Sequence, residues 1–366
     1  MNLDLFPKML FVIFLACLIT IPCLAQVPRD SVWIQAPNGC KVYNPHPVKS
    51  ETITWSGECS GGYAIGKGTL QWFKAGKPNQ QYDGEMKRGM PHGSGRYVYE
   101  DGSVREGMYV NGDLSGKGKI IRKYKSNVVS YTYIGDMLED FPSGKGTEIE
   151  FSEKGDTARV YTGEFADGVI KGEGVMKTRY GNFAKVQKGK FKQGLLIGNG
   201  EISEYYKGKR IEYYNGEFVN YARNGNGESA SGVTRYLGEW RDNKREGKGK
   251  SYLDSMLVYD GEWVDDKYHG AGKRIYIDGS SYYGQFRENR RHGIGKQRWK
   301  DGAMYIGEFA NDVYSGYGFI VKGGKLFACG NWLNGRLHTE VDFKRMKEVL
   351  LARHKNDLAQ FGINLQ

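Results

Sequence analysis

Large apolar and polar side chains alternate in short runs along most of this chain. Residues 161–165 (YTGEF) and 305–309 (YIGEF) are two such runs. Alternation with a period of two places the aromatic side chains on one face of a β-strand. A second strand-like run follows a Gly-x-Gly triplet, as in residues 318–321 (GFIV), and Asp-Gly pairs such as Asp278-Gly279 end several units. Because Asp-Gly tolerates the positive φ of a tight turn, each unit is predicted to be a β-hairpin.

The units repeat with a fixed glycine pattern, and this pattern predicts the architecture. An aromatic residue precedes a glycine by two positions and a Gly-x-Gly triplet follows, as in residues 259–263 (YDGEW) and 270–272 (GAG). A lone hairpin is only marginally stable in water, so neighbouring hairpins must cover its aromatic face. We therefore predict an all-β, elongated solenoid of stacked β-hairpins, on the order of 100 Å long at roughly 9–10 Å per unit. The first glycine of each copy lies at residues 57, 84, 107, 135, 163, 189, 216, 238, 261, 284, 307 and 330.

This pattern closely resembles the MORN (membrane occupation and recognition nexus) repeat. That repeat reads Tyr-x-Gly-x-Phe, then a glycine three residues on, then Gly-x-Gly four residues beyond. Residues 82–95 and 161–174 match in full register, and residues 55–68 match with Trp55 in the tyrosine position. About three quarters of the chain, as about twelve copies, carries the resemblance. It implies binding to acidic lipid or a role in protein assembly, and it implies no catalytic domain.

Some copies depart from the pattern. Gln187 replaces the leading tyrosine of one copy, and the copy at Gly330 lacks its Gly-x-Gly and is expected to be terminal. Asn and Asp replace the middle glycine in four copies and tolerate left-handed backbone. Tyr221 replaces it in a fifth copy, where a distorted unit is expected because tyrosine tolerates that backbone poorly. The residues at the middle position of these five copies are Tyr221, Asn243, Asp266, Asn289 and Asp312.

The first 25 residues are predicted to be a signal peptide. Residues 9–21 are apolar, and Cys23 and Ala25 are the small residues expected before cleavage at Gln26. The protein would then be secreted, to a periplasm or the exterior. An uncleaved membrane anchor is the alternative, but the apolar run is shorter than the ~20 residues that a span needs. Lipoprotein anchoring through residues 15–17 (LAC) is a third option.

Both ends of the repeat array, residues 54–337, are expected to be capped. Secretion permits disulfides, and a Cys40–Cys59 bridge would fasten the N-terminal cap, residues 26–53, onto the first repeat. Two free thiols are the alternative, and Cys329 is expected to be a packed small residue. In the C-terminal cap, residues 338–366, a helix is predicted over 342–360 that covers the last hairpin. The alternative is that this basic helix binds to a membrane surface. Its apolar face would carry Val341, Met346, Val349, Leu350 and Leu358.

Charge suggests acidic partners. The chain has 53 basic and 42 acidic residues, a net charge of +11. A basic, elongated protein attracts anionic surfaces, although nucleic acid is not expected for an exported protein. The densest basic doublets, Lys244-Arg245 and Arg290-Arg291, are therefore candidates for binding an acidic surface. A solvated strand edge that discourages aggregation is the alternative explanation.

Two sets of aromatic residues recur at fixed positions. The second aromatic of each copy is predicted to form the core, at Phe165, Phe191, Phe218, Trp240, Trp263, Phe286, Phe309 and Trp332. The leading tyrosines are predicted to line a groove, because a phenol tolerates partial exposure. These groove candidates are Tyr82, Tyr133, Tyr161, Tyr214, Tyr236, Tyr259, Tyr282 and Tyr305.

No motif for catalysis, metal binding or a cofactor stands out from the repeat. His92, His269 and His292 share one repeat position, but a metal site needs three or four converging ligands. The recurrent glutamates, such as Glu239, are expected to pair across strands with lysines such as Lys248. We therefore predict a non-enzymatic, exported scaffold for protein interaction or assembly, with an unknown protein partner or a second copy in a homo-oligomer. The alternative is peripheral binding to anionic membrane lipid or envelope glycolipid through basic faces of the repeats.

Overall fold

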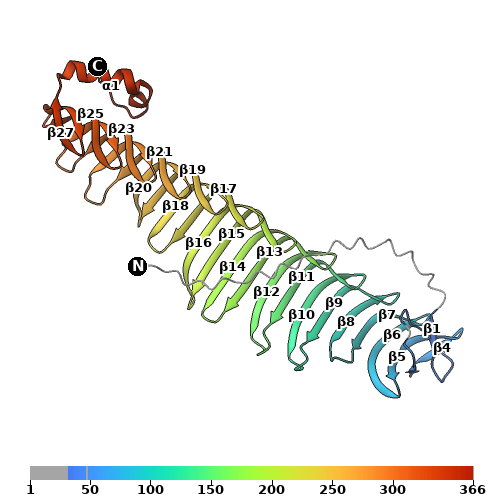
Figure 1. The fold of residues 1–366 in the computed structure, drawn as a ribbon. Coiled ribbons are helices and arrows are strands. Elements are labelled where there is room, and N and C mark those ends of the chain that lie inside the picture. Colours follow the sequence, from blue (N-terminus) through green and yellow to red (C-terminus); the bar gives the residue numbers. More distant parts are fainter. Residues whose placement is uncertain (1–31, 47, 366) are drawn as a thin grey trace.

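The molecule is an elongated, twisted rod built from one long sheet (Figure 1). The computed structural model describes residues 32–46 and 48–365, so the predicted signal peptide lies outside the described residues. The described chain forms a single sheet of 27 strands and one helix near its end. Consecutive strands from β5 onward pair antiparallel, and only β2 and β5 pair parallel. The prediction of an all-β elongated solenoid with a C-terminal helix is confirmed.

The strands of the N-terminal half run through the first part of the rod. They are β1 (Trp33–Gln35), β2 (Lys41–Tyr43), β3 (Glu51–Trp55), β4 (Glu58–Ser60), β5 (Tyr63–Lys74), β6 (Lys77–Lys87), β7 (Met90–Val98), β8 (Val104–Val110), β9 (Asp113–Lys123), β10 (Val129–Leu138), β11 (Phe141–Phe151), β12 (Thr157–Ala166), β13 (Val169–Tyr180), β14 (Phe183–Lys192) and β15 (Leu195–Tyr206).

The strands of the C-terminal half continue the same ladder up to the helix. They are β16 (Lys209–Val219), β17 (Ala222–Ser231), β18 (Thr234–Arg241), β19 (Lys244–Leu253), β20 (Met256–Val264), β21 (Lys267–Ile275), β22 (Ser281–Arg287), β23 (Arg290–Arg298), β24 (Met304–Ala310), β25 (Val313–Lys322), β26 (Lys325–Leu333) and β27 (Arg336–Glu340), followed by α1 (Phe343–Gln360).

A line of paired glycines runs along the middle of the sheet. Gly261 lies opposite Gly272 across the β20–β21 pair, and the other repeats place their glycines in the same register. The ring of Tyr259 lies over this pair, because a Cβ added at Gly272 would be 2.4 Å from the phenol oxygen. The hydroxyl donates to the carbonyl oxygen of Glu262 at 2.8 Å. Glycine is therefore needed here because the tyrosine ring occupies the space of a side chain.

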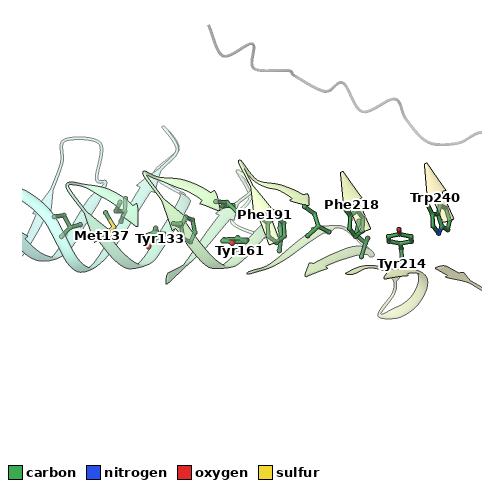
Figure 2. Close-up of a cluster of buried hydrophobic side chains, with 14 of the residues drawn as sticks. Tyr133, Met137, Tyr161, Phe191, Tyr214, Phe218 and Trp240 are labelled. Atoms are coloured by element: carbon green, nitrogen blue, oxygen red, sulfur yellow. The ribbon is translucent and has the colours of Figure 1, made fainter. Parts of the chain in front are cut away.

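The second aromatic residue of each repeat completes a continuous core. The Phe165 ring meets the rings of Tyr133 and Tyr161 edge-on, with centroids 5.1 and 5.2 Å apart. Phe191 meets Tyr161 in the same way at 5.4 Å. Figure 2 shows Tyr133, Tyr161 and Phe191 in a row along the rod. Edge-to-face contacts of this kind stabilise beyond simple burial. All eight predicted core aromatics are buried, so that prediction is confirmed.

Copies without a leading aromatic residue fill the same space with a leucine. Gln187 stands in the tyrosine position, and Leu196 from the next strand packs there instead: a Cβ added at Gly189 would lie 3.2 Å from its Cδ1. Leu196 is fully buried. The core therefore survives the substitution because a second position, seven residues after the first glycine, changes with it. The leucines at this position in the other copies that lack a leading aromatic residue are Leu114 and Leu337.

The strand register shifts directly after the first glycine of most repeats, and a carboxylate stabilises this bulge. The shift between Gly238 and Trp240 is one example. There the Glu239 carboxylate accepts the backbone N–H of Lys248 at 2.9 Å. Glu308 accepts from Tyr317 N in the same way at 2.6 Å. The predicted cross-strand pairing of these glutamates with lysines is found for Glu85, which lies 3.8 Å from Lys67, whereas Glu239 binds a main-chain donor instead.

Two-residue turns with positive φ line one edge of the rod and link successive repeats. Asp266 N donates to Arg245 O at 3.1 Å, and Arg245 N donates back to Asp266 Oδ1 at 3.0 Å. A glycine at the middle position can make only the first of these bonds. Tyr221 also adopts a left-handed φ of 72°, and its N–H donates to Leu196 O at 2.9 Å. The distortion expected at Tyr221 does not occur, because the ladder holds its backbone in the common geometry.

The N-terminal strands lie across the first repeats. Lys41 N donates to Gly62 O at 2.8 Å, and the Trp33 ring meets that of Tyr63 at 4.9 Å. Cys40 and Cys59 are free thiols in the structure. The two are nevertheless neighbours, and burial together with a hydrogen bond to Cys59 raises the pKa of Cys40 to about 11. The bridge between them stays a prediction.

Helix α1 begins one residue later than predicted. It covers more than the last hairpin, because it also packs back over the earlier strand β23. Asp342 caps it by accepting from the backbone N–H groups of Lys344 and Arg345 at 2.9 and 3.1 Å. Met346, Leu350 and Leu358 are buried against β23, β25 and β26. They belong to a second cluster on the sheet face opposite the tyrosine row, together with the buried Cys329.

Candidate binding groove

The inner face of the sheet has a second layer of side chains beside the leading tyrosines. This layer position lies two residues after each Gly-x-Gly and faces a tyrosine across the strands; Ser251, for example, is opposite both Tyr236 and Tyr259. Most repeats place a large side chain there. The full set along the rod is Leu70, Tyr97, Ile120, Glu148, Met176, Ile202, Ser229, Ser251, Arg274, Gln297 and Ile320.

Two small residues open a hollow in this layer. Ser229 and Ser251 stand where the repeats before them have Met176 and Ile202. A hollow of about 850 Å³ lies at this place, between β16 and β22, with both serines in its lining. Such a volume falls within the range of ligand pockets, which is roughly 300–1,000 Å³. We call it the serine hollow.

Arginines stacked on aromatic rings form the walls of the serine hollow. The Arg223 guanidinium lies 5.0 Å from the Tyr214 centroid and 5.3 Å from that of Trp240. Arg245 lies 4.3 Å from the Trp263 ring. Cation–π contacts of this kind contribute roughly 0.5–2 kcal/mol each, depending on exposure. The arginines therefore close the aromatic core from above as well as facing the hollow.

Most of these arginines are neutralised by carboxylates. Ion pairs join Arg223 to Glu212, and Arg235 to Glu228 at 2.7 Å. Arg274 differs: its guanidinium stacks 4.8 Å from the Tyr276 centroid, and no ion pair ties it to a carboxylate within the described part of the chain. One wall of the hollow thus carries positive charge without a fixed counter-charge.

Ser251 adds a polar group that lacks a partner. Its side chain is 8 % exposed, and its Oγ has no hydrogen-bond partner among the described residues. A buried hydroxyl without a partner costs about 1–3 kcal/mol. Ser251 lines the hollow but its Oγ is enclosed, so it is the small size of this side chain, not its hydroxyl, that helps to open the hollow.

The predicted basic surface is largely neutralised within the rod. Lys244 pairs with Asp265 at 2.7 Å, and Arg245 pairs with Asp266 at 2.9 Å. Arg291 bonds Asp312 at 3.2 Å and lies, partly exposed, over the Phe309 ring. Only Arg290 of the four candidates is exposed without an ion pair to a described residue. Three of the four candidates thus have a carboxylate partner from the next turn, and their binding to an acidic surface stays a prediction.

The predicted groove tyrosines are also misplaced. Seven of the eight are completely buried, and Tyr236 is 3 % exposed. The hydroxyl needs no solvent, because a carbonyl oxygen three residues further along accepts its hydrogen bond, as Glu217 O does for Tyr214 at 3.1 Å. Burial accordingly raises the pKa of Tyr133, Tyr161 and Tyr214 to about 12. These residues form the floor beneath the groove.

The residues that line the groove were missed in the sequence. Ser229, Ser251 and Arg274 follow no motif and are distinguished only by comparison with the same position in other repeats. The signal that could have predicted the hollow is a small side chain at a repeat position where the other copies carry a large one.

We also searched the described residues for a metal site and for a membrane-spanning helix. No group of three histidine, cysteine, aspartate or glutamate side chains within residues 32–46 and 48–365 is placed to hold a metal ion. No helix in the same residues has the length and apolar character needed to span a membrane.

Comparison with protein families agrees with the repeat. The family model for the MORN repeat matches eight segments, each starting at one of the eight leading tyrosines. Copies that start with another residue, such as Gln187, are outside the matches. MORN repeats are non-enzymatic modules that bind proteins or lipids. The matched segments are residues 82–104, 133–149, 161–179, 214–230, 236–254, 259–281, 282–304 and 305–322. The chain is thus similar to MORN-repeat proteins and carries this repeat at eight positions.

Proposed function

We propose that this protein is an exported, non-enzymatic scaffold of about twelve MORN repeats that binds a protein partner along its inner groove. The observation that carries this proposal is the serine hollow. Aromatic residues and four arginines line it, and no lysine is among the described lining residues. Tyrosine, tryptophan and arginine are enriched in protein interfaces, whereas lysine is depleted.

The rigidity of the rod supports the same function. The aromatic row and the turn ladder fix the spacing between repeats, so a partner meets a preformed surface. A preformed surface loses little conformational entropy on binding. Weak contacts at several repeats also add when one partner spans them.

A photo-crosslinking experiment tests this function. A photoreactive residue placed at Ser231, which lines the hollow on the same face as Ser229, is expected to capture a protein partner in the native host. Leu237 is the matched control, because it follows Tyr236 and is exposed on the opposite face. Equal capture from Leu237, or capture from neither position, argues against partner binding in the groove.

Export rests on the sequence of the first 25 residues alone. Sequencing the amino terminus of the mature protein is the direct test, and Gln26 is the expected first residue. A mature chain that starts at Met1 would contradict cleavage, and a lipid on Cys17 would establish the lipoprotein alternative.

One further observation favours a second function, binding to an anionic membrane. Along the turn edge, exposed apolar side chains are more frequent in the N-terminal half and exposed basic ones in the C-terminal half, where Val264, Val313 and Leu333 are also exposed. Two of these turns lie against each other, since a Cβ added at Gly168 would lie 3.3 Å from the Phe141 ring. The apolar members are Leu138, Phe141, Val169, Leu195 and Val219, and the basic members are Arg241, Lys244, Lys267, Arg287 and Arg290.

Liposome flotation separates the two functions. Membrane binding predicts flotation of residues 26–366 with anionic but not neutral vesicles, weakened by salt because exposed charges are screened over about 10 Å at 0.1 M. Arg287→Glu with Arg290→Glu should then abolish flotation and leave the fold intact. Failure to float on anionic vesicles at low salt removes this alternative.

A further inference from the structure

We propose that the serine hollow binds an acidic peptide segment, with a large apolar side chain in the hollow and a neighbouring carboxylate on Arg274. This inference rests on the proposed protein-binding function and names its ligand class. The hollow exists because two serines replace the large side chains found at the same position in earlier repeats. Its floor is the buried Tyr236 and Trp240.

The hollow is suited to an apolar side chain. Tyr252, Tyr268 and Tyr276 contribute rings to its lining, and the exposed Ile277 stands at its rim with 80 % of its surface accessible. Aromatic walls favour insertion of an apolar group because burial removes apolar surface from water.

The charge of the hollow favours an acid over a base. Four arginines line it, against the carboxylates of Glu212, Asp266 and Asp278. Glu212 and Asp266 already hold Arg223 and Arg245. Asp278 accepts from the backbone and hydroxyl of Ser280 at 2.9 and 2.7 Å, within its own turn. Arg235 pairs with Glu228, so Arg274 is the cation left to meet a ligand carboxylate.

A peptide is the occupant that this geometry fits. The strands beneath the hollow pair on both sides, so a ligand cannot extend the sheet and must be recognised through its side chains. An arginine that stacks on a ring holds its planar donors in place for a carboxylate. A contact of this type is typical of the anchor residues of protein interfaces.

Peptide selection provides the test. A displayed library of random twelve-residue peptides is selected on residues 26–366 and counter-selected on the Ser229→Ile, Ser251→Ile double variant. Ile202 occupies the equivalent position in an earlier repeat, so the isoleucines should fill the hollow without loss of fold. We expect enriched sequences with a large apolar residue next to Asp or Glu. Synthetic versions should bind the double variant at least tenfold more weakly.

Charge reversal distinguishes a ligand contact from a structural role. Arg274→Glu should lose the acidic peptides and select basic ones in a repeat of the experiment. Lys250→Gln is the matched control: this lysine pairs with Asp260 at 3.1 Å on the opposite face and should leave binding unchanged. Should the double isoleucine variant fail to fold, Ser229→Ile alone fills part of the hollow and should still weaken binding severalfold.

Three results would overturn the proposal: no enriched peptide, enriched peptides that bind the double variant equally well, or enrichment without acidic residues. Photo-crosslinking of a protein partner from a part of the inner groove outside the hollow would leave the scaffold function standing while this site failed. Crosslinking from neither face would remove both.

Discussion

The two halves of the rod share one core but close it differently. In the N-terminal half, aliphatic residues cover the tyrosine row at the position seven residues after the first glycine, as Ile170 and Leu196 do. In the C-terminal half, Arg245 and Arg291 occupy this position and stack on the rings below. The arginines also reach the carboxylate of the following turn. The tyrosine–glycine floor therefore accepts either an apolar or a charged cover.

This difference shows which layer of side chains distinguishes the surfaces of the two halves. The glycine line and the tyrosine row fix the backbone and leave the next layer free to vary. In the C-terminal half that layer is polar, and the serine hollow lies there. In the N-terminal half the layer is filled with side chains such as Met176, and exposed apolar residues appear at the turn edge instead.

Alkaline pH should produce the largest difference in stability between the two halves. Burial raises the pKa of Tyr214 to about 12, whereas an unfolded phenol titrates near pH 10. Each buried phenol makes its full contribution to the free energy of unfolding below about pH 10. That contribution is lost as the pH rises towards the folded pKa, by roughly 1.4 kcal/mol per pH unit for each such tyrosine. The C-terminal half has five consecutive repeats with a leading tyrosine, so we expect it to unfold first.

Hydrogen exchange between pH 9 and 11.5, corrected for intrinsic rates, measures this order. Loss of protection in β16–β25 before β8–β15 is the expected outcome. Simultaneous loss would mean that the two halves unfold as one cooperative unit.

The exchange of tyrosine for leucine between repeats provides a second comparison. Tyr259→Gln should destabilise its repeat by about 3–5 kcal/mol, the usual cost of emptying a large core site. Adding Tyr268→Leu copies the arrangement of Gln187 with Leu196 and should restore part of this loss. Urea unfolding of wild type, single and double variants gives the comparison. A double variant no more stable than Tyr259→Gln would show that leucine does not replace the ring.

Positive-φ glycines offer a smaller contrast between the halves. Gly270 has φ +53°, and a Cβ there would lie 2.1 Å from the Glu262 carboxylate. Gly198 has φ +63°, and nothing lies within 4 Å of an added Cβ. Both Gly270→Val and Gly198→Val should strain the backbone by roughly 1–2 kcal/mol. We expect a larger fall in Tm for Gly270→Val, because only this variant also displaces the Glu262 side chain. Equal shifts would exclude a contribution from Glu262.

Much of the fold follows from the sequence because its determinants are local. Alternation and glycine spacing specify the hairpins, and Asp342 with the apolar residues after it specifies the helix. The burial of the tyrosines did not follow, because the acceptor of each hydroxyl is positioned by a bulge that no single residue encodes. The partner of Arg245 lies 21 residues away. That separation is close to one repeat, so stacking register, rather than local pattern, decides whether a basic residue is free.

The smallest expected effect isolates the turn itself. Asp266→Gly converts a turn of the C-terminal half into the glycine turn found at Gly168 in the N-terminal half. The backbone bond from residue 266 to Arg245 O remains, but the return bond from Arg245 N and the ion pair are lost. Because the pair is partly exposed, we expect a loss of only about 1 kcal/mol. High salt should shrink the difference between wild type and Asp266→Gly if the ion pair dominates, and leave it unchanged if the backbone bond does. An unchanged or higher stability would show that glycine's tolerance of positive φ compensates for both lost bonds, and that the charged turns of the C-terminal half serve binding rather than folding.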